Sequence, residues 1–223
     1  HRYPGFKNYN IVFVTEKDSD DNKKDFVADL KKVLSKAGIS HQTIGSGDDF
    51  PSELKDKLNP DMPNLLVPTS SSKSTISHLL AHLKMTDISN VSLFGYPEWQ
   101  TYTDMYARFH ENDTYLYSIF FLDETQYKVR SVKDQYIEWY NKPLINSYPQ
   151  FAYLGYDDAI YFMTVIQRYG RNFETRIGET NISSLQSATH FERESDKGGY
   201  INKGIYFVHY KSDSTIEKID CNK

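Results

Sequence analysis

One segment of the sequence combines residue types that suit the recognition of a small ligand. The apolar run at residues 91–94 ends at Gly95, and Tyr96, Glu98 and Trp99 follow directly. In an open α/β sheet, ligands are bound just beyond the carboxyl ends of the strands. Glu98 could meet a ligand amine there, with Tyr96 and Trp99 as an apolar wall. The alternative is a proline-containing turn whose two aromatic rings fold back into the core, and the spacing does not separate the two.

A second polar segment follows the strand that we expect at residues 64–67. It consists of Thr69, Ser70, Ser71 and Ser72. These residues lead into an expected helix, whose unpaired N–H groups and positive dipole end can hold a ligand carboxylate. Ordinary capping of the helix without any ligand explains them equally well. Glu16 follows the first expected strand, so the three loops are predicted to converge at one edge of the sheet.

A further candidate pair is Tyr156 and Asp157, at the start of a helix expected over residues 156–169. Asp157 could supply a carboxylate to a ligand. The neighbouring Asp158 diverges from it on a helix, so the two are not a ready acid–base pair. The simpler interpretation is that one of the two aspartates caps the helix.

Motifs for catalysis and cofactor binding are missing from the sequence. It contains no G-x-G-x-x-G, Walker A or G-x-S-x-G pattern. His78 and His82 have the spacing of a helical zinc pair, but the glutamate of a zinc protease is absent, and both are expected on the solvent side of their helix. The lone Cys221 excludes cysteine-cluster metal sites. We therefore expect no enzymatic activity, no cofactor and no metal.

Composition narrows the possible partners. The formal net charge of −4 gives no general attraction to nucleic acid. No apolar run is long enough to predict a membrane-spanning helix. Aromatic residues make up 15% of the chain, with 18 Tyr and 13 Phe. Tyrosine suits wet binding surfaces, although a surface that merely tolerates tyrosine would give the same composition.

Strands and helices alternate through the first half of the chain. The spacing of Phe26, Leu30, Val33 and Leu34 predicts a helical face that ends before Gly38. Repeated alternation of this kind predicts an α/β fold: a Rossmann-like, mainly parallel sheet with helices on both faces. The expected strands lie at residues 11–15, 41–44, 64–67, 91–94 and 114–121.

The pattern changes after residue 121. We expect helices at residues 129–140 and 156–169 and late strands within 189–194 and 205–210. In the first of these helices, Trp139 and Tyr140 are expected to face inward with Val132 and Tyr136. The chain is therefore divided into an α/β lobe, residues 1–122, and a region of crossover helices and closing strands, residues 123–223, packed on or beside it.

The order of these segments resembles the type I periplasmic-binding-protein fold, in the branch that binds branched-chain amino acids. The resemblance rests on residues 10–14, 64–74, 94–99, 114–121, 153–159 and 198–210. A narrower resemblance, carried by residues 95–100 and 154–157, is to receptor-like domains found behind LysM repeats in cell-envelope proteins of Bacteroidetes. The segments are similar to the second lobe and the return crossing, and nothing corresponds to the first lobe.

This resemblance implies a non-enzymatic, solute-binding-like domain in the periplasm or cell envelope. Its candidate ligands are amino acids, short peptides or cell-wall fragments, bound weakly because only half a cleft is present. The alternative function is a structural or protein–protein interaction module. An α/β enzyme is a third and more distant alternative. The helices within residues 129–170 would touch the missing lobe, so an exposed apolar face on them favours a homodimer.

Overall fold

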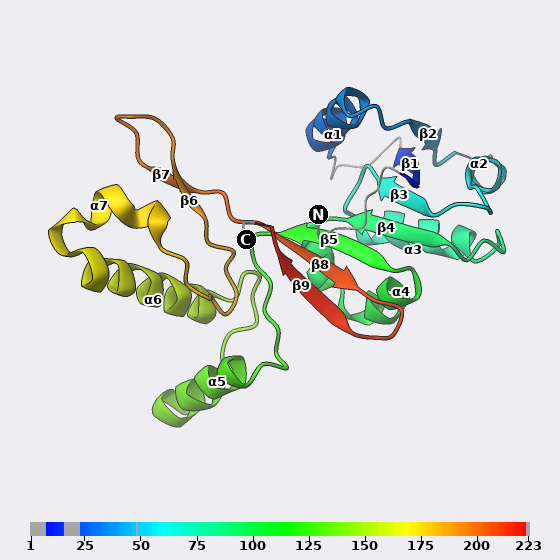
Figure 1. Ribbon diagram of the computed structural model, residues 1–223. Helices are drawn as coiled ribbons and strands as arrows, with labels where there is room; N and C mark the ends of the chain where they lie inside the picture. Colours follow the sequence, from blue (N-terminus) through cyan, green and yellow to red (C-terminus); the bar gives the residue numbers. More distant parts are fainter. Residues whose placement is uncertain (1–7, 16–22, 48, 222–223) are drawn as a thin grey trace. The chain divides into compact units, whose positions relative to one another are not determined.

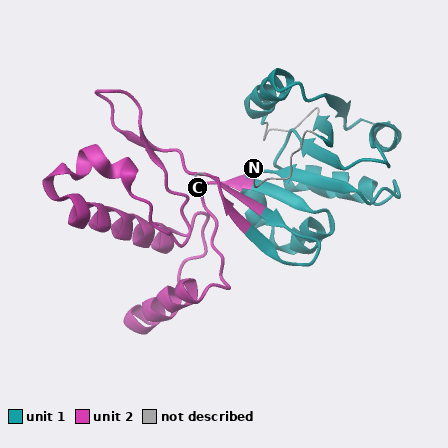
Figure 2. Cartoon of the chain, viewed as in Figure 1, with its two compact units in different colours: residues 1–116, 209–217 teal, residues 117–208, 218–223 magenta. Residues whose placement is uncertain are grey.

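The computed structural model describes residues 8–15, 23–47 and 49–221. The chain divides into two compact units, shown in teal and magenta in Figure 2. Unit 1 comprises residues 1–116 and 209–217, and unit 2 comprises residues 117–208 and 218–223.

Unit 1 is built around a mostly parallel sheet with flanking helices (Figure 1). β1 pairs in parallel with both β2 and β3, β3 with β4, and β4 with β5. The order of all seven strands is β2-β1-β3-β4-β5-β8-β9, so the expected α/β fold with a mainly parallel sheet is confirmed. The helices and strands of unit 1 are β1 (Asn10–Thr15), α1 (Lys24–Lys36), β2 (His41–Gly45), α2 (Phe50–Lys57), β3 (Asn64–Pro68), α3 (Lys73–Leu83), β4 (Val91–Gly95) and α4 (Tyr106–Glu111). Three further strands of the sheet, β5 (Thr114–Ser118), β8 (Tyr206–Tyr210) and β9 (Ile216–Asp220), have residues in both units.

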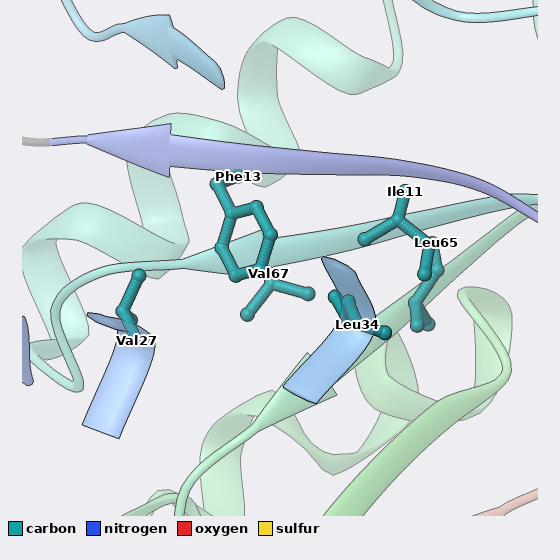
Figure 3. Close-up of a cluster of buried hydrophobic side chains, with 6 residues drawn as sticks. All are labelled: Ile11, Phe13, Val27, Leu34, Leu65 and Val67. Atoms are coloured by element: carbon teal, nitrogen blue, oxygen red, sulfur yellow. The ribbon is translucent and has the colours of Figure 1, made fainter. Parts of the chain in front are cut away.

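Alternation along the strands explains why both faces of this sheet are buried. Ile11 and Phe13 of β1 point to the face on which Val27 and Leu34 of α1 pack (Figure 3). Side chains of a strand alternate between its two faces, so Val12 points the other way. Val12 is also completely buried. A sheet covered on both faces requires continuous apolar strands, which is the pattern of the sequence.

A buried asparagine fixes the loops at the amino-terminal edge of the sheet. The side-chain amide of Asn64 donates to the carbonyl oxygens of Asn59 (2.7 Å) and Met62 (3.1 Å). Its Oδ1 accepts from the side chain of Asn10 and from the backbone N–H of Asn59, both at 2.8 Å. Asn90 donates to the carbonyl of Met62 at 2.6 Å. These bonds satisfy polar groups that would be costly to bury alone.

A second polar cluster joins the last strands of unit 1 to the turn before β5. Nε2 of His209 donates to Oδ1 of Asp113 at 2.7 Å, and Ser92 donates to Oδ2 at 3.2 Å. The imidazole of His209 also stacks on the ring of Tyr115, with 4.0 Å between centroids. The hydrogen bond from His209 is the main cause that lowers the pKa of Asp113. The ionised carboxylate of Asp113 therefore stabilises the folded protein.

Unit 2 consists of helices and a small antiparallel hairpin. α6 begins at Phe151, immediately after the Tyr148-Pro149 break, and not at residue 156 as expected. Asp157 and Asp158 consequently lie inside the helix, whose cap position is Gln150, so the interpretation that one of the two aspartates caps it is wrong. The elements are α5 (Tyr127–Tyr140), α6 (Phe151–Tyr169), α7 (Phe173–Arg176), β6 (Phe191–Arg193) and β7 (Tyr200–Asn202).

Asp157 instead organises a distant segment of the chain. Its Oδ1 accepts from the backbone N–H of Leu185 (2.7 Å), and its Oδ2 accepts from those of Gln186 and Ser187 (both 2.8 Å). The side chain of Tyr206 donates to the carbonyl of Ser187 at 2.7 Å. A buried carboxylate is tolerated when hydrogen bonds replace its hydration, and here three N–H groups do so.

The expected inward face of α5 is partly wrong. Trp139 is 72% exposed and Tyr140 is 59% exposed, whereas Val129 is buried. Val129 packs with Tyr153 and Leu185, and Val132 contacts the same cluster. The buried stripe thus lies on the first turns of α5, and Trp139 and Tyr140 at its carboxyl end remain largely exposed among the residues that the structure describes. Among the residues that the structure describes, no helix is both long and apolar enough to cross a membrane.

Replacing Asp113 with Asn should make stability less dependent on pH. A carboxyl group whose pKa is lowered on folding contributes stability above its unfolded pKa of about 3.9, and this contribution is lost as pH falls through the lower folded pKa. Urea unfolding at a series of pH values should show the variant less stable at neutral pH and the difference shrinking in acid. Asn tolerates the positive φ at this position (43°), so the backbone is unchanged. A difference that stays constant with pH would contradict this role.

Replacing Asp157 with Asn should lower the free energy of unfolding by about 3 kcal/mol, because an amide cannot accept from all three N–H groups and brings its own donors against them. The exposed neighbour offers a matched control: Asp158→Asn should change stability by less than about 0.5 kcal/mol. Urea unfolding followed by circular dichroism measures both, and hydrogen exchange should speed up at the amides of residues 185–187 in the first variant only. Equal effects of the two substitutions would contradict the anchoring role.

Candidate ligand-binding site

The loops that follow β3 and β4 converge in unit 1, as the sequence predicts. The hydroxyl of Tyr96 donates to the carbonyl of Pro68 at 2.6 Å. The hydroxyl of Tyr102, which lies between two short 3₁₀ helices, η2 (Pro97–Thr101) and η3 (Thr103–Met105), donates to the carbonyl of Ser71 at 3.3 Å. Both loops lie at the carboxyl ends of their strands, where α/β sheets bind ligands.

The segment that enters α1 joins the same edge. The backbone N–H of Lys23 donates to the carbonyl of Thr69 at 3.0 Å, and Thr69 donates to the carbonyl of Val14 at 2.8 Å. Glu16, the candidate after β1, lies outside the described residues.

The rings of Tyr96 and Trp99 do not form the exposed apolar wall that we expected. Both side chains are 0% exposed. Trp99 stacks on Phe109 of α4 with 5.4 Å between centroids, and Tyr96 meets it edge-on at 6.2 Å. A side chain at Gly95 would overlap the indole of Trp99, so glycine lets the ring fold back against the strand end. The alternative interpretation, a turn whose two aromatic rings fold back into the core, is therefore the correct one.

The serines before α3 act as its cap. Oγ of Ser72 accepts from the backbone N–H of Thr75 at 3.3 Å, and Oγ of Ser70 accepts from the N–H of Ser72 at 3.1 Å. Thr69, Ser70 and Ser71 are buried, whereas Ser72 is half-buried. Of these four candidates, Ser72 is thus the most accessible to a ligand.

Glu98 is a half-buried candidate in this site and is already paired. Its Oε1 lies 2.7 Å from Nζ of Lys23, and the two side chains are 44% and 21% exposed. The ammonium group of Lys23 also lies 5.4 Å from the centre of the Tyr96 ring. Within the described residues, Oε2 of Glu98 is buried without a hydrogen-bond partner. An open hollow of about 490 Å³ adjoins Lys23 at the start of α1.

The remaining two candidates belong to unit 2. Both oxygens of Asp157 are occupied by the backbone bonds described above. Tyr156 is half-buried and packs beside Val129 and Tyr153. The structure therefore gives Asp157 a structural role and leaves a ligand contact by Tyr156 as a prediction.

The residue that sequence analysis missed in this site is Lys23. It lies within a run of mixed charges, residues 18–25, whose pattern indicates a loop that enters a helix. Its position immediately before α1 and after a sheet strand was the available signal, because such positions face the carboxyl edge of the sheet.

The histidine pair on α3 lies on the outer side of the helix, as expected: His78 is exposed and His82 is half-buried. Nε2 of His78 and Nε2 of His82 are 3.0 Å apart, and both rings contact Phe50 at 5.6 Å between centroids. Within residues 8–15, 23–47 and 49–221, no three His, Cys, Asp or Glu side chains cluster as a metal-ligand set.

No family model matches the chain. No curated protein matches it either. Solved structures, in contrast, match nearly its whole length. An ABC transporter substrate-binding protein from Desulfitobacterium hafniense in complex with Leu is 13% identical, with a TM-score of 0.54 over 96% of this chain and 61% of that chain. A putative branched-chain amino acid ABC transporter protein from Rhodospirillum rubrum is 13% identical, with a TM-score of 0.56 over 95% of this chain and 61% of that chain.

An amino acid ABC transporter substrate-binding protein from Pseudomonas fluorescens is 11% identical, with a TM-score of 0.54 over 96% of this chain and 59% of that chain. The chain thus spans about three fifths of the length of the solved structures that it matches. At such low identity the likeness establishes the fold alone. The expected type I periplasmic-binding-protein-like α/β fold is confirmed.

Proposed function

We propose that this chain is part of a non-enzymatic, solute-binding-like domain that recognises its ligand at the carboxyl edge of the unit 1 sheet. The observation that carries the proposal is that three segments meet at this edge: Lys23 pairs with Glu98 and bonds to Thr69, and the hydroxyl of Tyr102 donates to the carbonyl of Ser71. The candidate ligands are amino acids, short peptides or cell-wall fragments. The likeness to amino-acid-binding proteins supports the first of these.

The same proposal covers the location of the protein and the domains that accompany this chain. A periplasmic or cell-envelope location, and a position behind LysM repeats in a Bacteroidetes protein, follow from the resemblance of residues 95–100 and 154–157. The chain would supply the second lobe, residues 1–122, with the crossover and closing elements in residues 123–223. A first lobe of the parent protein would complete the cleft, since the matched structures are longer.

Ligand binding should depend on Glu98 if this proposal is correct. Calorimetric titration with a panel of amino acids and muropeptides should give weak binding to this chain, because half a cleft leaves much of the ligand in water. In the longer parent protein, Glu98→Gln should weaken binding of a zwitterionic amino acid, whose carboxylate gives Lys23 a new partner, about tenfold, the equivalent of one charge-assisted hydrogen bond.

Glu111→Gln is the matched control. Glu111 is an exposed glutamate of unit 1 whose own lysine partner lies 4.0 Å away. Its substitution should leave the affinity unchanged. Failure of the parent protein to bind any member of the panel would overturn the recognition proposal.

A protein–protein interaction module is the second candidate function. It is favoured by apolar side chains of α5 and α6 that lie in solvent, chiefly Trp139 and Met163, the latter 67% exposed. Exposed apolar faces of this kind mark association sites. An α/β enzyme remains a distant third candidate.

If the chain is a protein–protein interaction module, we expect it to form a homodimer. Sedimentation velocity should then show a sedimentation coefficient that increases with protein concentration. Met163→Glu should shift it to monomer, because burying a charge in the interface is unfavourable. Ile216→Glu, on β9 in unit 1, is the control and should not affect association. A strict monomer at the highest attainable concentration would contradict this prediction.

A further inference from the structure

Unit 2 contains a cavity that none of the functions above uses. It has a volume of about 410 Å³, within the usual range for small-molecule sites. Its walls come from the first turns of α5, the segment between α5 and α6, and the first turn of α6. The residues that matter for its chemistry are Glu124, Arg130, Lys133, Leu144, Asn146 and Tyr153.

The apolar side of this cavity is held in place by internal bonds. Tyr153 is 1% exposed, and its hydroxyl donates to the carbonyl of Val129 at 3.0 Å. Leu144 packs on the same cluster. The backbone N–H of Gln150 donates to the side chain of Gln186 at 2.9 Å, which fixes the entry to α6. A preformed apolar surface of this kind lowers the ordering cost of binding.

The charged side of the cavity carries an excess of cations. Arg130 and Lys133 are one turn apart on α5 and both line the cavity. Neither side chain forms an ion pair with any residue that the structure describes. Glu124 is the one lining carboxylate, and Asp134 lies nearby on α5. Burial first, and then the charges of Glu124 and Asp134, raise the pKa of Tyr153.

We propose that this cavity binds a small monocarboxylate with a compact apolar body. The guanidinium of Arg130 matches a carboxylate in a two-point geometry, and Lys133 adds a second positive charge. Leu144 covers the apolar body of the ligand, and the buried ring of Tyr153 supports that wall from behind. Because Glu124 offsets one of the two cations, the lining has a single net positive charge, which suits a monoanion better than a dianion. The site uses only unit 2 residues and is independent of the function proposed for unit 1.

The experiment is an NMR titration of the whole chain with phenylacetate, read at the side-chain amide of Asn146 and the backbone amide of Gln150. Phenylacetate should shift both signals to saturation. The uncharged isostere phenylacetamide should bind at least tenfold more weakly, because it lacks the charge that the cations recognise. The Arg130→Gln/Lys133→Gln double variant should weaken phenylacetate binding by at least the same factor. Both residues are exposed, so the fold is expected to survive.

Lys128→Gln is the matched control, since Lys128 lies on the same helix but does not line the cavity. It should leave the affinity unchanged, as should Glu98→Gln in unit 1, so this proposal and the unit 1 proposal fail separately. The proposal is overturned by an absence of saturable shifts, by equal affinity for the acid and the amide, or by a loss in the Lys128 control as large as in the double variant.

Discussion

Unit 2 depends on one buried carboxylate. Three successive N–H groups, those of residues 185–187, point at Asp157 of α6 and have no helix or strand ladder to satisfy them. An unpaired backbone N–H in the interior costs as much as a lost hydrogen bond. The Asp157 carboxylate is therefore what allows an irregular segment to cross the interior, where it also forms the bridge between Ser187 and Phe120.

Buried tyrosines play a similar part throughout the molecule. The hydroxyls of Tyr96, Tyr153, Tyr161 and Tyr206 each donate to a backbone carbonyl. A tyrosine used this way fills the core with its ring and satisfies a carbonyl that lies outside regular structure. Part of the high tyrosine content therefore stabilises the fold from inside, a role that composition alone did not distinguish from a tyrosine-lined binding surface or a surface that tolerates tyrosine.

Local patterns in the sequence predicted the local structure. The apolar spacing before Gly38 predicted α1, and the continuous apolar runs predicted the buried strands β1 and β3. Nonlocal contacts were not accessible in this way. The pairing of Glu98 with Lys23 joins residues far apart in the chain. The exposure of Trp139 depends on which other elements pack against α5, and the sequence of α5 alone does not give that information. The sequence indicated Asp157 as a candidate ligand contact or helix cap. Its actual partners lie in a segment without any periodic pattern, so the sequence did not reveal them.

The same physical reasoning limits the affinity expected at the unit 1 edge. Glu98 already holds an ammonium group, that of Lys23, at 2.7 Å. A ligand amine that takes its place exchanges one charge-assisted bond for an equivalent one, so the net gain is small unless Lys23 finds a new partner. A carboxylate on the ligand would provide that partner. Under the proposed function, a zwitterion would therefore suit the edge of unit 1 better than a simple amine, because both members of the existing ion pair are then satisfied at once.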